Sequence, residues 1–302
     1  MSAAAAPTDI REANVRYHDL AAADYDAKWG IDYGERGRRQ VVGKLRKALG
    51  TGRLGTFGHA LEIGAGTGYF GLNLQRAGVI GRYTATDISP GMLAVLEGSA
   101  DRLGVPVETT ACDAAGLPFA DQSFDLVFGH AVLHHLPDLD ASFGEFMRVL
   151  RPGGAVAFCG EPSHYGDRIA AVPKRAAHAL APAWRKLIGA RAAPRNGHHH
   201  GPEAALLEQV VDIHAFTPAM LARPVRDAGF ADVRVSGEEL AASLFGWANR
   251  ALEATAEPAD VPRLWHHYAY RGYLGLQALD RSLLEPYLPA AVFYNLLVSG
   301  RC

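Results

Sequence analysis

Short apolar runs alternate with helical segments from residue 58 onward. The runs that predict strands are His59–Ile63, Arg82–Asp87, Val105–Ala111, Phe124–Gly129 and Ala155–Gly160. Helical patterns near 67–77, 89–103 and 139–150 separate them. Such alternation is typical of a parallel sheet with helices on both faces, and right-handed crossovers make that sheet doubly wound. The predicted fold class is therefore α/β.

The pattern changes on both sides of this alternation. Residues 8–50 are expected to form two helices. A helix at 217–228 precedes a strand at Asp232–Ser236, and Ala290–Ser299 is expected to be an antiparallel last strand. We predict a Rossmann-like, mostly parallel sheet with helical cap insertions. Its parts are N-terminal helices (1–57), the core (58–163), a basic helical and loop insertion (164–216), the end of the core sheet (217–238 and 290–302) and an aromatic-rich helical cap (239–289).

The composition is that of a globular protein. Of the 302 residues, 49% are hydrophobic and 21% are charged. The formal net charge of −2 gives no reason to expect nucleic acid as a partner. The N-terminus lacks a basic region and an apolar stretch of signal-peptide length, and no apolar run reaches the roughly 18 residues that cross a bilayer. We therefore expect a cytoplasmic protein without stable membrane insertion.

Cysteine and histidine usage indicates no metal centre. Cys112, Cys159 and Cys302 are scattered and odd in number, so they form neither a disulfide framework nor a CxxC pair, and they fit a reducing compartment. The run His198–His200 has the chemistry of a metal ligand, but no cysteine lies near it and the flanking prolines indicate a loop. We expect no metal site.

A glycine-rich loop follows the first predicted strand. Gly64, Gly66 and Gly68 lie where the strand ends and a helix begins. Glycine lets the backbone turn tightly and approach a ligand, and a helix N-terminus offers free N–H groups. Asp87 ends the second strand, where a carboxylate can accept hydrogen bonds from both hydroxyls of an adenosine ribose. The loop also fits the dinucleotide pattern GxGxxG, so these features alone leave the choice of cofactor open.

Five motifs in chain order indicate which cofactor the loop binds. They are the glycine loop Glu62–Gly68, the strand-two acid within Thr86–Met92, the aspartate within Ala111–Ala114, the stretch Leu117–Val127 with Leu133–Asp138, and Arg148–Gly154. With these motifs, residues 60–160 resemble class I S-adenosylmethionine-dependent methyltransferases, in particular the methyltransferase type 11 group that includes the ubiquinone and menaquinone methyltransferases. Thr217–Phe230 is similar to the helix before that group's sixth strand and extends the likeness to about residue 238.

The resemblance implies S-adenosyl-L-methionine as the cofactor. The loop glycines would line its methionine part, Asp87 and Ile88 would hold the ribose, and Cys112–Ala114 would hold the adenine. Gly129 and His130 would face the reacting methyl group. The N-terminal helix is expected to close over the cofactor through Tyr17, Tyr25 and Trp29, which lack another evident role. The predicted cofactor-binding residues are Tyr17, Tyr25, Glu62, Gly64, Ala65, Gly66, Thr67, Gly68, Asp87, Ile88, Met92, Cys112, Asp113, Ala114, Gly129 and His130.

Methyl transfer from a sulfonium needs little covalent help from a protein. The protein must align an acceptor atom about 3 Å from the methyl group and exclude water. An acceptor oxygen with a high pKa would gain from a base, and the groups near the predicted pocket are His130, His134, His135, His164 and Glu161. His130 and His135 are our catalytic candidates, and a structural or substrate-positioning role is the alternative for each.

The likeness favours a methyltransferase over two other functions. Asp113 and the Leu133–Asp138 string speak against a nicotinamide-dependent oxidoreductase. The chain also lacks a Tyr-x-x-x-Lys catalytic pair, because neither Tyr165, which Ile169 follows four places on, nor Tyr268 supplies it. A non-catalytic S-adenosylmethionine-binding protein would not need an intact glycine loop with both cofactor acids. A motif of the type N/D-P-P-Y after the fourth strand would indicate methylation of an amino group in a protein or nucleic acid. This chain has Gly129–Val132 at that place instead, so such an acceptor is less expected. The expected partner is a small-molecule acceptor, and the sequence leaves open whether the protein forms a homodimer.

The two insertions are the segments expected to recognise the acceptor. The cap carries aromatic residues that would wall a pocket for a partly apolar or aromatic molecule, and a core of its own is the alternative. These residues are Phe245, Trp247, Trp265, Tyr268, Tyr270 and Tyr273. Residues 164–200 carry seven basic residues against one acid. Such a segment fits an acidic lipid headgroup or an acidic substrate, with a solvated basic face as the alternative.

Overall fold

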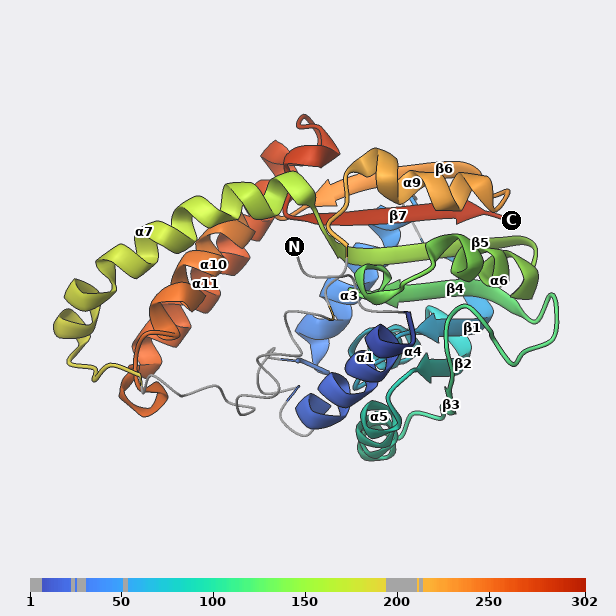
Figure 1. Cartoon of the computed structure of the whole chain (residues 1–302), viewed down its shortest axis with the longest axis horizontal. Coiled ribbons are helices and arrows are strands. Elements are labelled where there is room, and N and C mark those ends of the chain that lie inside the picture. The colour runs from blue at the N-terminus through green and yellow to red at the C-terminus, as the bar shows by residue number, and fades with distance from the viewer. Residues whose placement is uncertain (1–6, 23–24, 26–30, 51–53, 194–210, 212–213) are drawn as a thin grey trace.

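A seven-stranded sheet forms the centre of the computed structural model, which describes residues 7–22, 25, 31–50, 54–193, 211 and 214–302 (Figure 1). The strand order is β3-β2-β1-β4-β5-β7-β6. The strands are β1 (Phe57–Ile63), β2 (Ile80–Asp87), β3 (Glu108–Ala111), β4 (Phe124–His130), β5 (Leu150–Pro162), β6 (Ala231–Glu238) and β7 (Asn295–Arg301). β1 to β5 pair in parallel, and β7 runs antiparallel to β5 and β6. The predicted α/β class with an antiparallel last strand is confirmed.

The central strands are buried on both faces, and their ends share one edge of the sheet. Leu61 of β1 pairs with Thr84 of β2 on one side and with Val127 of β4 on the other. Ala60, Leu61 and Val127 are fully buried. A parallel strand covered on both sides needs a nearly continuous apolar run, which is the pattern that predicted these strands. The carboxyl ends of β1, β2 and β4 therefore lie side by side.

Helices cover both faces of the sheet. α3 (Glu35–Ala48), α4 (Tyr69–Arg76) and α5 (Pro90–Leu103) bury apolar side chains in one cluster, and α6 (Leu139–Val149) and α9 (Pro218–Asp227) bury theirs in another. Ser89 caps α5 and Thr217 caps α9, and each side chain accepts a backbone N–H hydrogen bond from the first turn of its helix. A capping hydroxyl followed by proline is a strong start signal, so both helix starts follow from local sequence.

Several predicted strand boundaries are wrong. β1 and β2 begin two residues earlier than expected and β5 begins five residues earlier, whereas β3 and β7 begin later. Val105 belongs to the end of α5, where its N–H donates to Ala100 O at 3.0 Å after Gly104 takes a φ of 64°. Val105 is apolar like a strand residue, but its N–H is used to close the end of the helix. β3 therefore starts only at Glu108. At the other end, Pro289 starts a short 3-10 turn, η5 (Ala290–Val292), and β7 begins after it.

Three helices form an arm beside the sheet. α7 (His164–Ile188), α10 (Ala241–Glu253) and α11 (Arg263–Leu279) extend away from the strands in Figure 1. η3 (Pro258–Asp260) joins α10 to α11, and a π-helical turn, η4 (Asp280–Leu284), follows α11. Within the described part of the chain, no helix combines the length and the apolar character that crossing a membrane requires.

Several aromatic residues of the cap pack within this arm. Trp265 lies 5.0 Å from Trp184 of α7 and 5.4 Å from Tyr268, measured between ring centroids. Phe245 lies 5.6 Å from Tyr268 in an edge-on arrangement. These contacts match the alternative in which the insertion has its own core.

A buried ionic network joins the arm to the core. Nζ of Lys44 on α3 pairs with the carboxylate of Glu238 at the end of β6, and lies 3.3 Å from Glu239 Oε1. Tyr273 and Gln277 of α11 each donate a hydrogen bond of 2.8 Å to Glu239. Burial opposes the charge of Lys44, but the two carboxylates outweigh it and raise its pKa well above the ordinary value. One lysine thus holds together α3, β6 and α11.

Replacing that lysine should destabilise the fold. Lys44→Met leaves two buried carboxylates without their cation, and breaking a buried ion pair on one side costs about 3–5 kcal/mol of unfolding free energy. Urea denaturation followed by circular dichroism measures the loss. Arg39→Met, on the same helix but with a side chain 74% exposed, is the control and should unfold like the wild type. Equal midpoints for the two variants would contradict the role assigned to Lys44.

Candidate active site

The glycine loop forms one wall of the candidate site. Gly64, Gly66 and Gly68 have φ values of 61°, 53° and 91°, in a region that other residues rarely adopt. A Cβ on Gly64 would lie 2.2 Å from Val132, so neighbouring atoms already fill that space. A Cβ on Gly66 would meet no atom within 4 Å. The backbone at Gly66 is therefore open to a ligand.

Asp87 joins the loops that follow β1 and β2. Its Oδ2 accepts a hydrogen bond from Gly66 N–H at 2.8 Å, and its Oδ1 accepts one from Ser89 N–H at 2.9 Å. Burial raises the pKa of this carboxyl, while the hydrogen bonds to backbone N–H groups favour the ionised form. Because a carboxylate can accept about four hydrogen bonds, Asp87 retains capacity for further donors. The half-buried Ile88 follows it.

Glu62, Ala65 and Thr67 are buried inside the protein. The Glu62 carboxylate accepts hydrogen bonds from Gly71 N–H at 3.1 Å and from the Tyr83 hydroxyl. Burial raises its pKa to about 8. Ala65 and Thr67 are 6% and 2% exposed. These three residues are placed to shape the loop, and a direct cofactor contact is a prediction that stays open for them.

The loop after β3 is tied to the loop after β2 and to the N-terminal helix. Cys112 N–H donates to Asp87 O at 3.1 Å. Nε of Arg11, on α1 (Pro7–Ala21), lies 2.5 Å from Asp113 Oδ2. Ala114 is 7% exposed and packs in the core. The acid expected to hold adenine thus carries a contact from α1.

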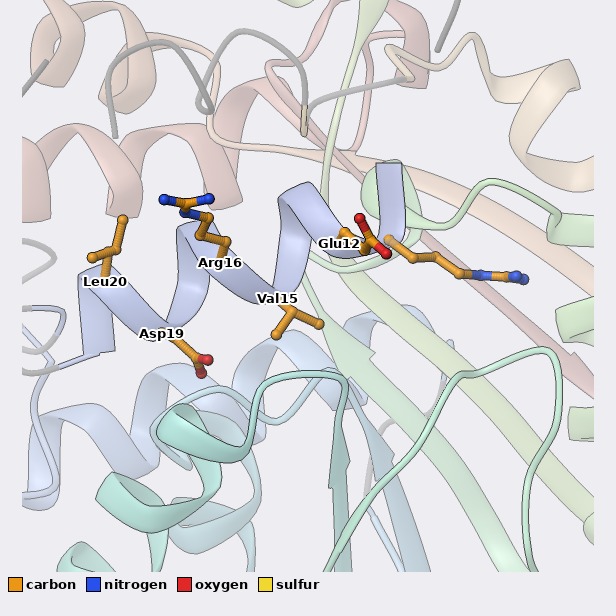
Figure 2. A pocket seen from close by; sticks show the side chains of 6 residues that line it. Glu12, Val15, Arg16, Asp19 and Leu20 are labelled. Atoms are coloured by element: carbon orange, nitrogen blue, oxygen red, sulfur yellow. The ribbon is translucent and has the colours of Figure 1, made fainter. Parts of the chain in front are cut away.

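α1 lies over the ends of these strands. The Asp19 carboxylate accepts hydrogen bonds from the Ser89 hydroxyl and from Gly91 N–H, the latter at 3.0 Å. Figure 2 shows Val15 and Asp19 pointing from α1 toward α5 and the loop that precedes it. A cavity of about 500 Å³ runs along this helix, lined by Arg11, Glu12, Val15, Arg16, Asp19 and Leu20. All six of these described residues belong to α1.

The predicted aromatic residues of the N-terminal segment have different surroundings. Tyr17 is buried and its ring lies edge-on to His18 at 5.2 Å. Tyr25 lies beyond the end of α1, because that helix ends at Ala21, and its ring packs in a small cluster with the buried Met92. The expectation that Tyr25 belongs to the first helix is wrong. Trp29 falls outside the described residues.

Gly129 and His130 end β4 next to the glycine loop. A Cβ on Gly129 would lie 2.8 Å from the backbone of β1 and from the Phe158 ring, so strand packing selects glycine. The His130 ring stacks on Phe70 at a centroid distance of 5.3 Å. Burial, and then the positive charge of Lys44, lower the pKa of His130 to about 3. The imidazole is therefore neutral near pH 7 and is a weak base.

A buried carboxylate holds the turn that follows β4. Glu161 of β5 accepts backbone hydrogen bonds of 3.0 to 3.2 Å from residues 132–134, and one of 2.9 Å from Nδ1 of His134. The turn is η2 (Leu133–His135). Burial would raise the pKa of Glu161, but the hydrogen bonds from His134 and the backbone outweigh burial and lower it. An ionised acid inside the protein thus fixes this turn.

His135 lies between two segments that are distant in the sequence. Its Nδ1 donates to Val211 O at 2.9 Å, and the His18 ring of α1 lies edge-on at 5.4 Å. Burial, with the neighbouring histidines, lowers the pKa of His18 to about 3. His135 is thus held in place on both sides, and its predicted catalytic role stays open.

The contacts made by α1 were not predicted from the sequence. Arg11 and Asp19 are eight residues apart, which places them near one face of a helix. That spacing was available as a signal, but it does not name the partners, which lie far along the chain. Among the residues with described positions, no three His, Cys, Asp or Glu side chains gather as a metal site would require. The run His198–His200 lies outside those residues.

The site can hold a molecule that carries vicinal hydroxyl groups. It combines open backbone at Gly66, the carboxylate of Asp87 and the acid Asp113 at the ends of three adjacent parallel strands. Ligands of open α/β sheets bind outside the carboxyl ends of the strands, near the point where the strand order reverses. β1 and β4 flank that point here.

Comparison with known proteins assigns this core to a family. Residues 61–158 match the family model described as "Methyltransferase domain". The chain is 38% identical over 132 residues to the malonyl-[acyl-carrier protein] O-methyltransferase of Methylococcus capsulatus, covering 43% of this chain and 42% of that protein. It is 42% identical over 107 residues to the demethylmenaquinone methyltransferase of Thermobifida fusca, covering 34% and 43%. The chain thus spans less than half the length of these two relatives.

Solved structures share the fold at low sequence identity. Phosphoethanolamine N-methyltransferase 2 of Haemonchus contortus, solved in complex with S-adenosyl-L-methionine, gives a TM-score of 0.52 at 17% identity, covering 87% of this chain and 52% of that chain. The [4+2]-cyclase SpnF gives a TM-score of 0.56 at 17% identity, covering 97% and 96%. Fold, motif order and family match agree: the core of this chain is a methyltransferase domain of the class I, S-adenosylmethionine-dependent type.

Proposed function

We propose that this protein transfers the methyl group of S-adenosyl-L-methionine to a small, partly apolar or aromatic acceptor by in-line displacement. The observation that carries the proposal is the junction of Asp87 with Gly66. One carboxylate fixes the loops after β1 and β2, and the glycine backbone beside it faces open space. This combination suits a nucleoside whose ribose meets the acid and whose tail follows the glycine loop.

Each residue at the strand ends would contact a different part of the cofactor. Asp87 would accept the ribose hydroxyls, Asp113 would meet the adenine, and the backbone from Gly64 to Gly68 would follow the methionine part. When bound, S-adenosylmethionine supplies an electrophilic methyl group on a sulfonium that is already a good leaving group. The protein's own contribution is alignment and the exclusion of water.

The acceptor would approach from the side of Tyr69 and His130. These rings lie edge to face with their centroids 6.0 Å apart, at the start of α4 and the end of β4. Burial raises the pKa of Tyr69 to about 12, so its hydroxyl keeps its proton. With its lowered pKa, His130 is better suited to positioning an acceptor than to removing a proton. Tyr69 and His130 thus offer an aromatic surface together with a hydroxyl group and an imidazole nitrogen. Such a surface favours a small, partly apolar acceptor.

A second function is supported by one comparison. The chain shares its fold with SpnF, which is described as a [4+2]-cyclase, so this fold alone does not specify methyl transfer. The alternative is a protein that binds S-adenosylmethionine without transferring its methyl group. A nicotinamide-dependent oxidoreductase is a more distant alternative. A cytoplasmic location and a small-molecule acceptor are parts of our proposal.

Two measurements separate these functions. Mass spectrometry of the ligand released from purified protein should detect S-adenosylmethionine or its demethylated product. Incubation with methyl-labelled S-adenosylmethionine and a small-molecule extract of cells should move label into a low-mass product. Binding without label transfer would favour the non-catalytic alternative, and a released nicotinamide cofactor would overturn the proposal.

Asp87→Ala should weaken cofactor binding. Loss of hydrogen bonds to a carboxylate costs about 1.5–3 kcal/mol, or about 10- to 150-fold in affinity for S-adenosylmethionine and its demethylated product. Isothermal titration calorimetry measures the change. Asp87→Asn keeps the shape of the side chain and separates lost charge from altered loop structure. Asp101→Ala, exposed on α5, is the control and should bind normally. Unchanged affinity in folded Asp87→Ala would remove this residue from the site.

α1 should behave as a cover of the cofactor site. We expect the demethylated product to slow amide hydrogen exchange in residues 10–21, because α1 contacts both the β2–α5 loop and Asp113. Asp19→Ala removes the link to Ser89 and Gly91 and should raise exchange there about tenfold without ligand. Glu12→Ala on the same helix is the control. If the product leaves exchange in α1 unchanged, the helix is a packing element only.

A further inference from the structure

α7 buries one of its sides against the arm. Ala170, Ala177, Ala181 and Trp184 are buried, and α7 packs along α10. The intervals of seven, four and three residues place these side chains on one face of a helix. Much of the opposite side of α7 is exposed.

An apolar stripe runs along the exposed side of α7. Its members recur at intervals of four, three, eight and seven residues, so they line up along the helix. The stripe consists of Tyr165, Ile169, Val172, Leu180 and Leu187. Val172, Leu180 and Leu187 are 68%, 63% and 84% exposed. Large apolar side chains in a continuous exposed row mark a surface that contacts something.

A row of basic residues borders this stripe. Arg168, Arg175 and Lys186 are exposed and follow one another at intervals of seven and eleven residues, close to whole helical turns. At 100° per residue they lie beside the apolar stripe, on the side away from the buried face. The acid of α7, Asp167, points elsewhere and pairs with Lys174. The charge that borders the stripe is therefore of one sign.

We propose that α7 rests on an anionic lipid surface, with the apolar stripe in the headgroup layer and the basic row against lipid phosphates. An apolar face beside a basic row is the arrangement of helices that lie in a membrane interface. Five basic residues against one acid give α7 a formal charge of +4 in a chain whose net charge is −2. Charge complementarity thus selects an anionic surface as the partner. This inference does not depend on the proposed methyl transfer.

Sedimentation with lipid vesicles tests the inference. The wild type should bind vesicles of phosphatidylcholine containing about one third phosphatidylglycerol, release in high salt, and bind pure phosphatidylcholine weakly. The variant R168Q/R175Q/K186Q should bind anionic vesicles about 100-fold more weakly, because each basic residue near the surface contributes roughly fivefold. V172S/L187S should lose about tenfold or more. All five substituted positions are exposed in the wild type, so both variants should keep the wild-type circular dichroism spectrum and Tm.

A matched variant and a measurement of mass complete the test. R102Q/R223Q/R226Q removes three exposed charges from α5 and α9 and should bind vesicles like the wild type. Equal binding of wild type and R168Q/R175Q/K186Q, or an equal loss in the matched variant, would overturn the proposal. Analytical ultracentrifugation that finds a wild-type dimer dissociated by V172S/L187S would also overturn it, because a second copy would then cover the stripe.

Discussion

The parallel pairing of β1 with β2 and β4 is the constraint on which the candidate site depends. Parallel strands end at one edge, so residues separated by a helix in the sequence become neighbours there. Asp87 reaches Gly66 N–H for this reason, although 21 positions separate them. The residues of the candidate site do not need to be close in the sequence, because the sheet brings them together at the carboxyl ends of its strands.

Sequence patterns predicted the features that are local or periodic. The apolar runs of the central strands, the glycines with positive φ and the capping residues Ser89 and Thr217 each act through their immediate neighbours. The boundaries of β3 and β7 failed where a cap or a proline turn competed with an apolar run. Val105 looks like strand in sequence, but its N–H closes the end of α5. A hydrogen bond to a preceding helix is not visible as periodicity.

Long-range polar contacts were beyond sequence reasoning. Lys44 and Glu238 are 194 positions apart, and their residue types alone give no sign that they meet. Glu161 is similar: its carboxylate serves the turn after β4 from the next strand, through hydrogen bonds that only the register of β4 and β5 provides. Buried charged groups of this kind cost solvation and are weak evidence of net stability, and our hypothesis is that these two select one arrangement of the elements. The family resemblance assigns residues of the glycine loop to contacts with a cofactor. The fold leaves space for a ligand there, but it does not specify which ligand binds.

The position of β7 sets an order of events during synthesis. β5 and β6 lie on either side of β7 and do not pair with each other. β5 can pair with β4 at once, but its other edge and the whole of β6 have no sheet partner until residues 295–301 are made. Until that segment leaves the ribosome, β5 presents an unpaired apolar edge, and the long arm helix α7 is already attached to its end. An exposed edge of this kind is open to pairing with other chains. The nascent chain is therefore most open to such pairing in the interval between the synthesis of β5 and that of β7.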